Sequence, residues 1–327
     1  MPFYGPSLPH SAALSDLLAP GLAAKPDEIA LISGNRRWTW RELQRDIDAL
    51  ASGLTTLGLN RGDRIASLMP NQGELLLFYL ACHKAGLIVT PLNYRYTPPE
   101  IDYALGLSGA AALCVGAERS ADVEASALAR TLPKGLICFG GPIGDAPRFE
   151  DLVASGTPTA DLPTPDINDP ALIFFTSGST GKPKGVTHSY SSFGCMAASF
   201  AGALDLSQDD IVLPGGSIAH IGSLSTAFAA FFAGATVVIP HSFDAATILS
   251  ALRQHRPTIL LMIPAAFVAM ERDPDTTHED FSSLRICVTG GDKFPANVAK
   301  EFADKTGVLI QETYGLTEGA DCLFNQS

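Results

Sequence analysis

Short apolar segments alternate with longer segments of helical character along most of the chain, beginning near Arg64. The short runs of β-branched and apolar residues indicate buried strands, and the longer segments between them have the spacing of helices. This alternation is typical of α/β layers around a mostly parallel sheet. In the first part of the chain it predicts strands at Arg64–Met69, Leu87–Leu92, Ala111–Val115 and Leu136–Phe139, and helices at Gly73–Ala85 and Pro98–Leu107.

A stretch rich in Pro, Thr and Asp, from Thr157 to Pro170, interrupts this periodicity. Because such clusters are typical of loops between folded units, we expect two α/β subdomains, residues 1–165 and residues 166–327. The strands predicted after the boundary are Ala171–Thr176, Ile211–Leu213, Thr236–Ile239, Thr258–Ile263, Arg285–Thr289 and Val308–Gln311. The helices predicted between them lie near His188–Leu204, Ser223–Ala233, Ala245–Gln254 and Pro295–Thr306.

Composition and charge narrow the class of function. With 34 acidic and 22 basic residues the formal net charge is −12, so the whole chain would be repelled by nucleic acid and by anionic membrane surfaces. Any bound phosphate must therefore be held by a local group of donors. The six cysteines do not have the spacing of metal ligands, and no apolar run reaches the length of a membrane span. We expect reduced thiols and a cytoplasmic location.

Such a local group of donors follows the predicted strand that ends at Thr176. The run Thr176–Gly185 combines glycines, hydroxyl side chains and two lysines. Glycines allow positive φ, so successive N–H groups can converge on an anion, while the hydroxyls donate further hydrogen bonds and lysine adds positive charge. This composition favours a polyphosphate site over the alternative, a plain surface turn.

Two common phosphate motifs do not fit this run. A Walker A loop needs Gly five residues before its Gly-Lys pair and Ser or Thr after the Lys, whereas Thr176 and Pro183 occupy these positions. The dinucleotide pattern GxGxxG is absent as well, because Gly178 and Gly181 lack a third glycine in the right place.

The run Thr176–Gly185 is instead similar to the AMP-binding signature of the adenylate-forming superfamily. That superfamily includes acyl-CoA synthetases, peptide-synthetase adenylation domains and firefly-type luciferases. The resemblance implies an α/β fold of two Rossmann-like layered subdomains with ATP bound between them near this run. It implies that Lys182 is catalytic. The residues that it implies for binding the cofactor are Thr176, Ser177, Gly178, Ser179, Thr180, Gly181 and Lys184.

A second block, Glu312–Glu318, resembles the Tyr-Gly-x-Thr-Glu block of the same family. By this resemblance Tyr314 stacks on adenine, Thr317 approaches the α-phosphate and the substrate carboxylate, and Glu318 helps to hold Mg²⁺. A flat aromatic ring suits a purine, and a carboxylate oxygen suits Mg²⁺. Taken alone, the heptapeptide is equally compatible with an ordinary exit from a strand.

Two further candidates follow from the resemblance. Gly290 and Gly291 look like the turn that lies along the adenosine, and Asp292 departs from the small residue that often follows them. His220 sits where many acyl-CoA synthetases carry a His or aromatic residue beside the substrate carboxylate, which makes it a candidate catalytic residue. For a lone His among apolar residues, a structural role is the alternative.

The resemblance covers nearly the whole chain, but complete members of the family are longer. The Thr-Gly-Asp segment, the hinge and the Pro-Lys-x-x-x-Gly-Lys segment with the catalytic lysine are not found. We therefore expect the N-terminal portion of the enzyme, lacking the C-terminal small domain. Because this chemistry works by positioning and charge stabilisation, we expect weak nucleotide binding and little turnover from these residues alone.

The implied parent enzyme is an acid-thiol ligase, a carboxylate-CoA ligase that forms AMP. It would convert a carboxylic acid, fatty or aromatic, with ATP, Mg²⁺ and coenzyme A to an acyl-adenylate and then to acyl-CoA. The alternatives are a non-catalytic nucleotide-binding fragment, an oxidative luciferase, and an amino-acid adenylation domain of a peptide synthetase. For the last, Phe200–Phe232 offers no obvious contact for the amine.

Overall fold

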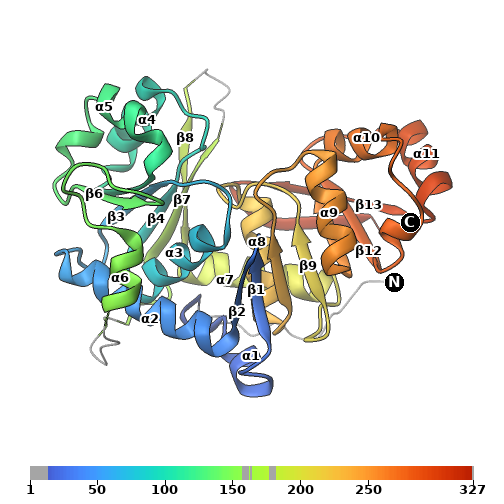
Figure 1. Ribbon diagram of the computed structural model, residues 1–327, viewed down its shortest axis with the longest axis horizontal. Coiled ribbons are helices and arrows are strands. Elements are labelled where there is room, and N and C mark those ends of the chain that lie inside the picture. The colour runs from blue at the N-terminus through green and yellow to red at the C-terminus, as the bar shows by residue number, and fades with distance from the viewer. Residues whose placement is uncertain (1–13, 157–161, 163, 177–181, 326–327) are drawn as a thin grey trace.

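Two β-sheets alternate with three layers of helices (Figure 1). The structure is a computed structural model that describes residues 14–156, 162, 164–176 and 182–325, apart from the side chains of residues 15 and 320–325. The first sheet has eight strands in the spatial order β14 (Gly319–Asn325), β13 (Ile310–Leu316), β12 (Ile286–Gly290), β11 (Ile259–Met262), β9 (Ile211–Pro214), β10 (Thr236–Ile239), β1 (Ile29–Ser33) and β2 (Arg36–Thr39).

The second sheet has six strands in the order β6 (Leu136–Phe139), β5 (Ala112–Gly116), β3 (Arg64–Leu68), β4 (Ile88–Pro91), β7 (Pro170–Thr176) and β8 (Lys184–Ser189). Neighbouring strands run parallel in both sheets except in three hairpins at the edges, β1–β2, β13–β14 and β7–β8. The predicted α/β fold with mostly parallel sheets is confirmed.

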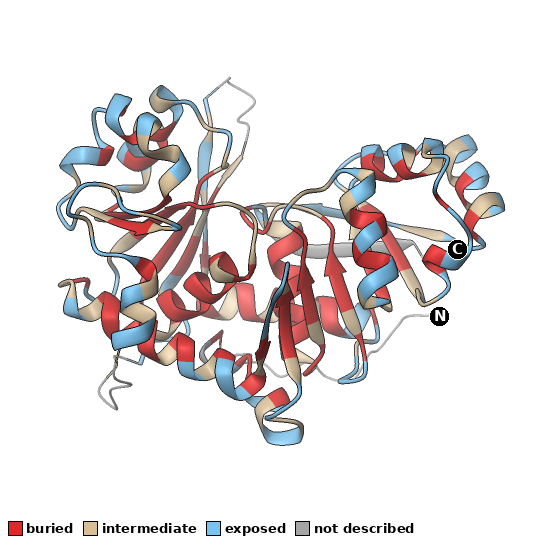
Figure 2. Ribbon diagram, in the orientation of Figure 1, coloured by how far each residue is buried: buried red, intermediate tan, exposed pale blue. Residues whose placement is uncertain are grey.

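The layer between the sheets holds the largest apolar core. It consists of α2 (Trp40–Thr56), α3 (Gly73–Lys84), α7 (Tyr190–Ala203) and α8 (Ile221–Phe232). In α3 and α8 nearly every residue is buried, which is expected for helices covered by a sheet on both sides. Figure 2 shows these central elements as the most deeply buried part of the molecule.

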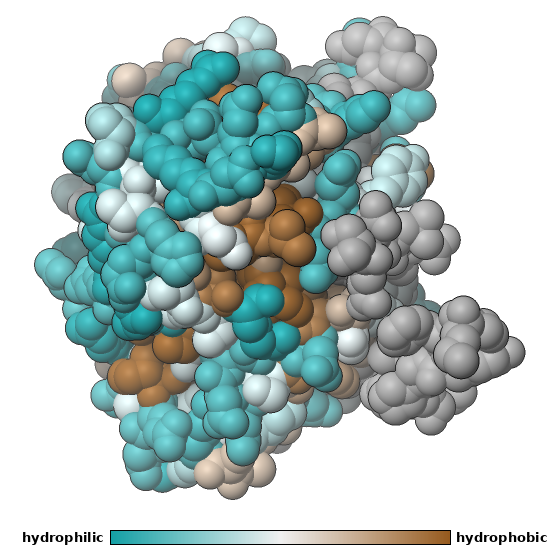
Figure 3. Space-filling model, turned by 90° about the vertical axis from the view of Figure 1, so that its right-hand side faces the viewer, coloured by the Kyte–Doolittle hydropathy of each residue, from teal (hydrophilic) through white to brown (hydrophobic). Residues whose placement is uncertain are grey.

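The outer helices bury one side only. Against the six-stranded sheet pack α4 (Pro98–Ser108) and α5 (Ser120–Ala125), and against the eight-stranded sheet pack α9 (Ala245–His255), α10 (Pro264–Arg272) and α11 (Ala296–Thr306). Two short helices, α1 (Ala19–Ala24) and α6 (Phe149–Ser155), contact α2. The end of the molecule nearest α10 and α11 exposes a gathered area of apolar side chains between hydrophilic ones (Figure 3).

Local signals in the sequence account for several helix ends. Thr39 and Glu42 form a capping box at the start of α2, and Thr97 and Glu100 form another before Pro98 of α4. At the carboxyl end of α11, Gly307 adopts the left-handed conformation with φ 75° and ends the helix.

A buried carboxylate joins the amino ends of three strands in the eight-stranded sheet, β9, β11 and β12. Asp210, just before β9, accepts bonds from Arg285 Nε and Nη2, both at 2.8 Å, and from the Thr258 hydroxyl at 2.6 Å. Burial by itself would raise the pKa of Asp210, but these hydrogen bonds outweigh burial and lower the pKa to about 2. Three neighbouring strands are thereby joined at their amino ends.

The two sheets do not follow the predicted division at residue 165. The β1–β2 hairpin, from the first half, joins β10 in the eight-stranded sheet, and the β7–β8 hairpin, from the second half, joins β4 in the six-stranded sheet. Each hairpin extends an otherwise open edge, so each sheet contains strands from both halves. A boundary drawn at residue 165 therefore does not separate the sheets.

In the part of the chain that the structure describes, no helix combines the length and the apolar character needed to cross a membrane. The cytoplasmic location stays a prediction.

Candidate nucleotide site

Several predicted site residues lie along one edge of the eight-stranded sheet. Strands β9, β11, β12 and β13 are parallel, so their carboxyl ends share this edge, and the register pairs Leu261 with Pro214 and Gly290 with Thr313. Gly290 ends β12, Tyr314 lies near the end of β13, and the segment that leads to His220 follows β9. In open α/β sheets, ligands bind outside the carboxyl ends of the strands.

The Gly-Gly turn after β12 has a structural requirement at each glycine. A Cβ atom on Gly290 would lie 2.7 Å from Thr313 Cγ2, so only glycine allows this approach of β12 and β13. Gly291 has φ 86° and open space where a side chain would be. Asp292 is exposed, and its Oδ1 accepts a bond of 2.7 Å from the Lys293 amide. The turn thus offers exposed backbone at the sheet edge.

The β13–β14 hairpin presents three of the predicted residues. Tyr314 is 62% exposed near the end of β13. Leu316 pairs with Gly319, so Thr317 and Glu318 form the tip of this hairpin. Glu318 is exposed and Thr317 is partly buried. An exposed aromatic ring and an exposed carboxylate on one hairpin suit a base and a metal-bound phosphate.

The β7–β8 hairpin carries the predicted phosphate loop. Thr176 ends β7 and pairs with Lys184 at the start of β8. Lys182 and Lys184 are both exposed, and the Tyr103 hydroxyl of α4 donates to the Pro183 carbonyl between them at 2.9 Å. The predictions that lie outside the described residues are those for Ser177, Gly178, Ser179, Thr180 and Gly181.

A buried histidine joins the two hairpins. His188 Nε2 donates to the Thr317 carbonyl at 2.7 Å, across 129 residues of sequence. The donor role follows because a carbonyl oxygen can only accept. This bond places the arm of the hairpin that begins at Lys184 against the tip that carries Thr317 and Glu318. The structure therefore brings together, from opposite sheets, the two sequence blocks that resemble the nucleotide-binding blocks of the family.

Sequence reasoning did not identify this role of His188. The sequence placed His188 at the start of a predicted helix, whereas β8 continues to Ser189 and α7 begins at Tyr190. A usable signal was present, because the less exposed Val186 and His188 alternate with the exposed Gly185 and Thr187 in this strand. What could not be foreseen is which distant carbonyl the inward-facing imidazole would meet.

His220 precedes α8 and keeps its side chain exposed. Desolvation by the surrounding protein lowers the pKa of His220 below its ordinary value, which favours the neutral imidazole at neutral pH. The loop before it is held by Asn71, whose Nδ2 donates to the Pro240 carbonyl at 2.7 Å and whose Oδ1 accepts from the Ile218 amide at 2.9 Å.

The described residues offer few ligands for a divalent metal at this edge. Among the described residues, no three His, Cys, Asp or Glu side chains gather as a metal site. Mg²⁺ commonly binds through one or two carboxylates together with substrate phosphates and water. The exposed Glu318 fits such a shared site.

The chain is similar to known proteins over most of its length. Residues 20–325 match the model of the family described as AMP-binding enzyme. Among relatives, a feruloyl-CoA synthase of Amycolatopsis sp is 34% identical over 298 residues, which are 90% of this chain and 57% of that protein. A long-chain-fatty-acid–CoA ligase of Mycobacterium tuberculosis, FadD13, is 31% identical over 86% of this chain and 55% of its own length.

Solved structures give the same result. The anthranilate CoA ligase AuaEII in complex with anthranoyl-AMP superposes with a TM-score of 0.90 at 25% identity, covering 97% of this chain and 62% of that one. The chain thus spans somewhat more than half the length of the relatives that it matches. It belongs to the family of AMP-binding enzymes.

Proposed function

We propose that the protein binds ATP with Mg²⁺ and activates a carboxylic acid to an acyl-adenylate, which then reacts with coenzyme A to give acyl-CoA. The observation that carries this proposal is the bond from His188 to Thr317, because it unites the lysine-bearing hairpin with the Thr317–Glu318 tip. The resemblance and the structure then point to one site rather than to two separate loops.

The residues present suit a nucleotide. Exposed Tyr314 offers a face for the base, the open backbone at Gly291 allows close approach, and exposed Lys182 and Lys184 offer positive charge to phosphates. The bound Mg²⁺ would supply neutralisation of phosphate charge next to Glu318. In an in-line attack by a carboxylate on phosphorus, the chain contributes orientation and charge rather than a nucleophile.

For the acid, we propose an aromatic or fatty carboxylate. The relatives include a feruloyl-CoA synthase and a long-chain-fatty-acid–CoA ligase, and one structural neighbour holds anthranoyl-AMP. His220, whose pKa is lowered by desolvation, would face the acid as a hydrogen-bonding group. Coenzyme A would enter as the second substrate.

Calorimetric titration of the 327-residue chain with ATP, with and without Mg²⁺, tests the proposal. Because charge-assisted bonds to phosphate contribute strongly, we expect Lys182→Ala to weaken ATP binding about tenfold. Lys300→Ala is the matched control, since Lys300 is an exposed lysine on α11 that pairs with Asp304. Equal affinities for the Lys182 variant and the parent chain would count against the site.

Turnover is a separate measurement. We propose that these 327 residues alone release acyl-CoA slowly. The Pro-Lys-x-x-x-Gly-Lys segment, which carries the catalytic lysine in the family that the sequence resembles, is not found among them. A pyrophosphate-exchange assay with ferulate or a long-chain fatty acid distinguishes the enzyme from the alternative. ATP binding without any exchange, in the chain and in any longer form of the protein, would favour a non-catalytic nucleotide-binding module.

A further inference from the structure

The tip of the β13–β14 hairpin carries two proposed functional residues but has little support from the sheet. Thr317 and Glu318 lie between the paired residues Leu316 and Gly319, and Leu316 and Glu318 are exposed. We propose that His188 is a positioning residue that fixes this tip against the β7–β8 hairpin. This inference rests on the proposed function, in which Thr317 and Glu318 act on the nucleotide.

The contact itself is a direct hydrogen bond to the backbone of the tip. His188 Nε2–H donates to the Thr317 carbonyl at 2.7 Å, which lies within the ordinary range for this bond. Because the bond is made to the backbone, the position of the tip does not depend on the rotamer of either functional side chain. The other ring nitrogen, Nδ1, lies 3.5 Å from the Ser192 hydroxyl.

The imidazole is held in place by side chains of two elements, β7 and α7. His188 is only 5% exposed, and its ring packs against Phe174 of β7 and Phe193 of α7, with centroid distances of 6.3 and 5.9 Å. Ser192, behind Nδ1, belongs to the capping box with Ser189 that starts α7. Because the ring is packed against β7 and α7, its bond holds the Thr317 carbonyl at a defined position relative to β7 and β8.

Energetics favour the bond over an unbonded state. A buried ring N–H that loses its acceptor keeps the full cost of its desolvation, and the Thr317 carbonyl would lose a donor at the same time. The tip is therefore expected to stay at a fixed distance from Lys184, four residues before His188 in the same strand. Groups that stabilise a transition state must be placed within a fraction of an ångström, which gives such fixation its value.

Hydrogen exchange of the nucleotide-free chain tests the bond without any ligand. His188→Phe keeps a buried ring but removes the donor, and we expect the amides of residues 316–319 to exchange about tenfold faster. His188→Gln can place an amide N–H near the position of Nε2, and it should restore slow exchange. His83→Phe is the matched control, because His83 is also buried but its ring contacts Tyr190 and Phe228 instead.

Titration with ATP in the presence and absence of Mg²⁺ tests the functional consequence. We expect the gain in ATP affinity that Mg²⁺ produces to fall about tenfold in His188→Phe, and to be retained in His188→Gln and His83→Phe. If His188 acts through the tip, Glu318→Gln loses the same gain, and the double variant loses no more than either single one. A general loss of folding would instead lower affinity with and without Mg²⁺.

The outcomes separate this inference from the proposed function. Unchanged exchange at residues 316–319 in His188→Phe overturns the positioning role, even if the parent chain binds ATP well. Additive losses in the double variant overturn it as well. If the parent chain binds no ATP, the proposed function fails and the role toward Mg²⁺ fails with it, whereas faster exchange in His188→Phe would still show that His188 fixes the tip.

Discussion

Tyr314 is a residue whose role in binding can be tested without disturbing the fold. It is 62% exposed, so its removal should leave stability nearly unchanged. Stacking of a base on an aromatic ring is lost when the ring is truncated, and we expect Tyr314→Ala to weaken ATP binding about tenfold. Tyr314→Phe should bind ATP like the parent chain, because the stacking face is kept.

The measurement is a fluorescence or calorimetric titration, with Leu309→Ala as control. Leu309 is 68% exposed just before β13 and is not among the predicted site residues. A Tyr314→Ala variant that binds ATP as tightly as Leu309→Ala would show that the base lies elsewhere.

Among single residues, the sequence predicted those whose chemical type matches a local motif. Tyr314, Thr317 and Glu318 were identified within one heptapeptide, and the structure places them at one hairpin. His188 and Asn71 were not identified as site residues, because their roles depend on bonds to Thr317 and to Pro240 that lie far away in sequence. A residue that acts through a distant backbone atom leaves no local pattern.

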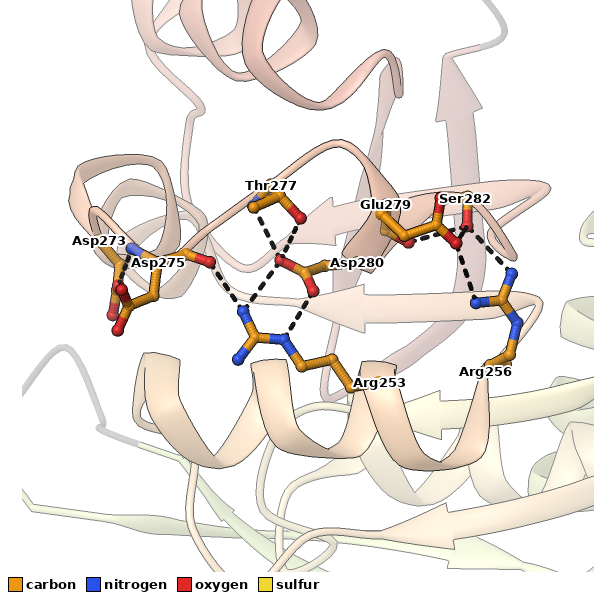
Figure 4. Close-up of polar contacts among 8 residues, drawn as sticks. All are labelled: Arg253, Arg256, Asp273, Asp275, Thr277, Glu279, Asp280 and Ser282. Atoms are coloured by element: carbon orange, nitrogen blue, oxygen red, sulfur yellow. Dashed lines mark hydrogen bonds and ion pairs between the residues drawn. The ribbon is translucent and has the colours of Figure 1, made fainter.

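At the scale of elements, two arginines at the end of α9 bind the segment after α10 (Figure 4). We expect them to contribute unequally to stability. Arg253 binds both carboxylate oxygens of Asp280, at 2.7 and 3.1 Å, and the Asp275 carbonyl at 2.7 Å. The side chain of Asp280 is only 6% exposed. Arg256 instead reaches Glu279, whose side chain is 79% exposed, at 3.4 Å.

We expect Arg253→Ala to lower the free energy of unfolding clearly more than Arg256→Ala, because among the described residues it leaves the nearly buried Asp280 carboxylate with Thr277 as its remaining donor. Arg256→Ala should cost about 0.5 kcal/mol, since exposed pairs contribute little. Urea unfolding of both variants measures the difference. Equal losses would show that the burial of Asp280 has no part in holding α9.

Elements with a clear hydrophobic period were predicted well, and polar hairpin strands were not. The strands Leu136–Phe139 and Thr236–Ile239 and the helix Ala245–Gln254 agree with β6, β10 and α9 to within a residue. Strand β8, Lys184–Ser189, was not predicted, because it is mostly exposed and its sequence is that of a loop followed by a helix start. Its strand conformation comes from pairing with β7.

For the whole molecule, the buried His83 makes stability depend on pH. Burial lowers the pKa of His83 from its ordinary 6.5 to about 3, against a weaker opposing effect of the Ala171 backbone. In the unfolded chain the imidazole takes up a proton as the pH falls below 6.5, whereas in the folded chain it stays neutral until about 3. The contribution of neutral His83 to stability is therefore fully present above pH 6.5 and decreases as the pH falls from 6.5 toward 3.

We expect the fall in unfolding free energy between pH 7 and pH 5 to be about 2 kcal/mol smaller in His83→Phe than in the parent chain. Urea unfolding at the two values of pH measures this difference, and the exposed His241 provides the control variant His241→Phe. The same pH dependence in all three chains would contradict a neutral, buried His83.

The pairing of each edge hairpin with the sheet of the other half could not be predicted from the sequence, since the paired strands lie far apart in the chain. The pairing of β1 with β10 also affects folding during synthesis. The Thr236 hydroxyl on β10 donates to the Ile29 carbonyl on β1 across 207 residues, and Leu31 pairs with Val237. A ribosome therefore releases the β1–β2 hairpin long before β10, the strand on its other side, is translated. Until then the apolar side chains of Ala30, Leu31 and Ile32, all buried in the finished sheet, need shelter from a chaperone or from transient collapse of the nascent chain.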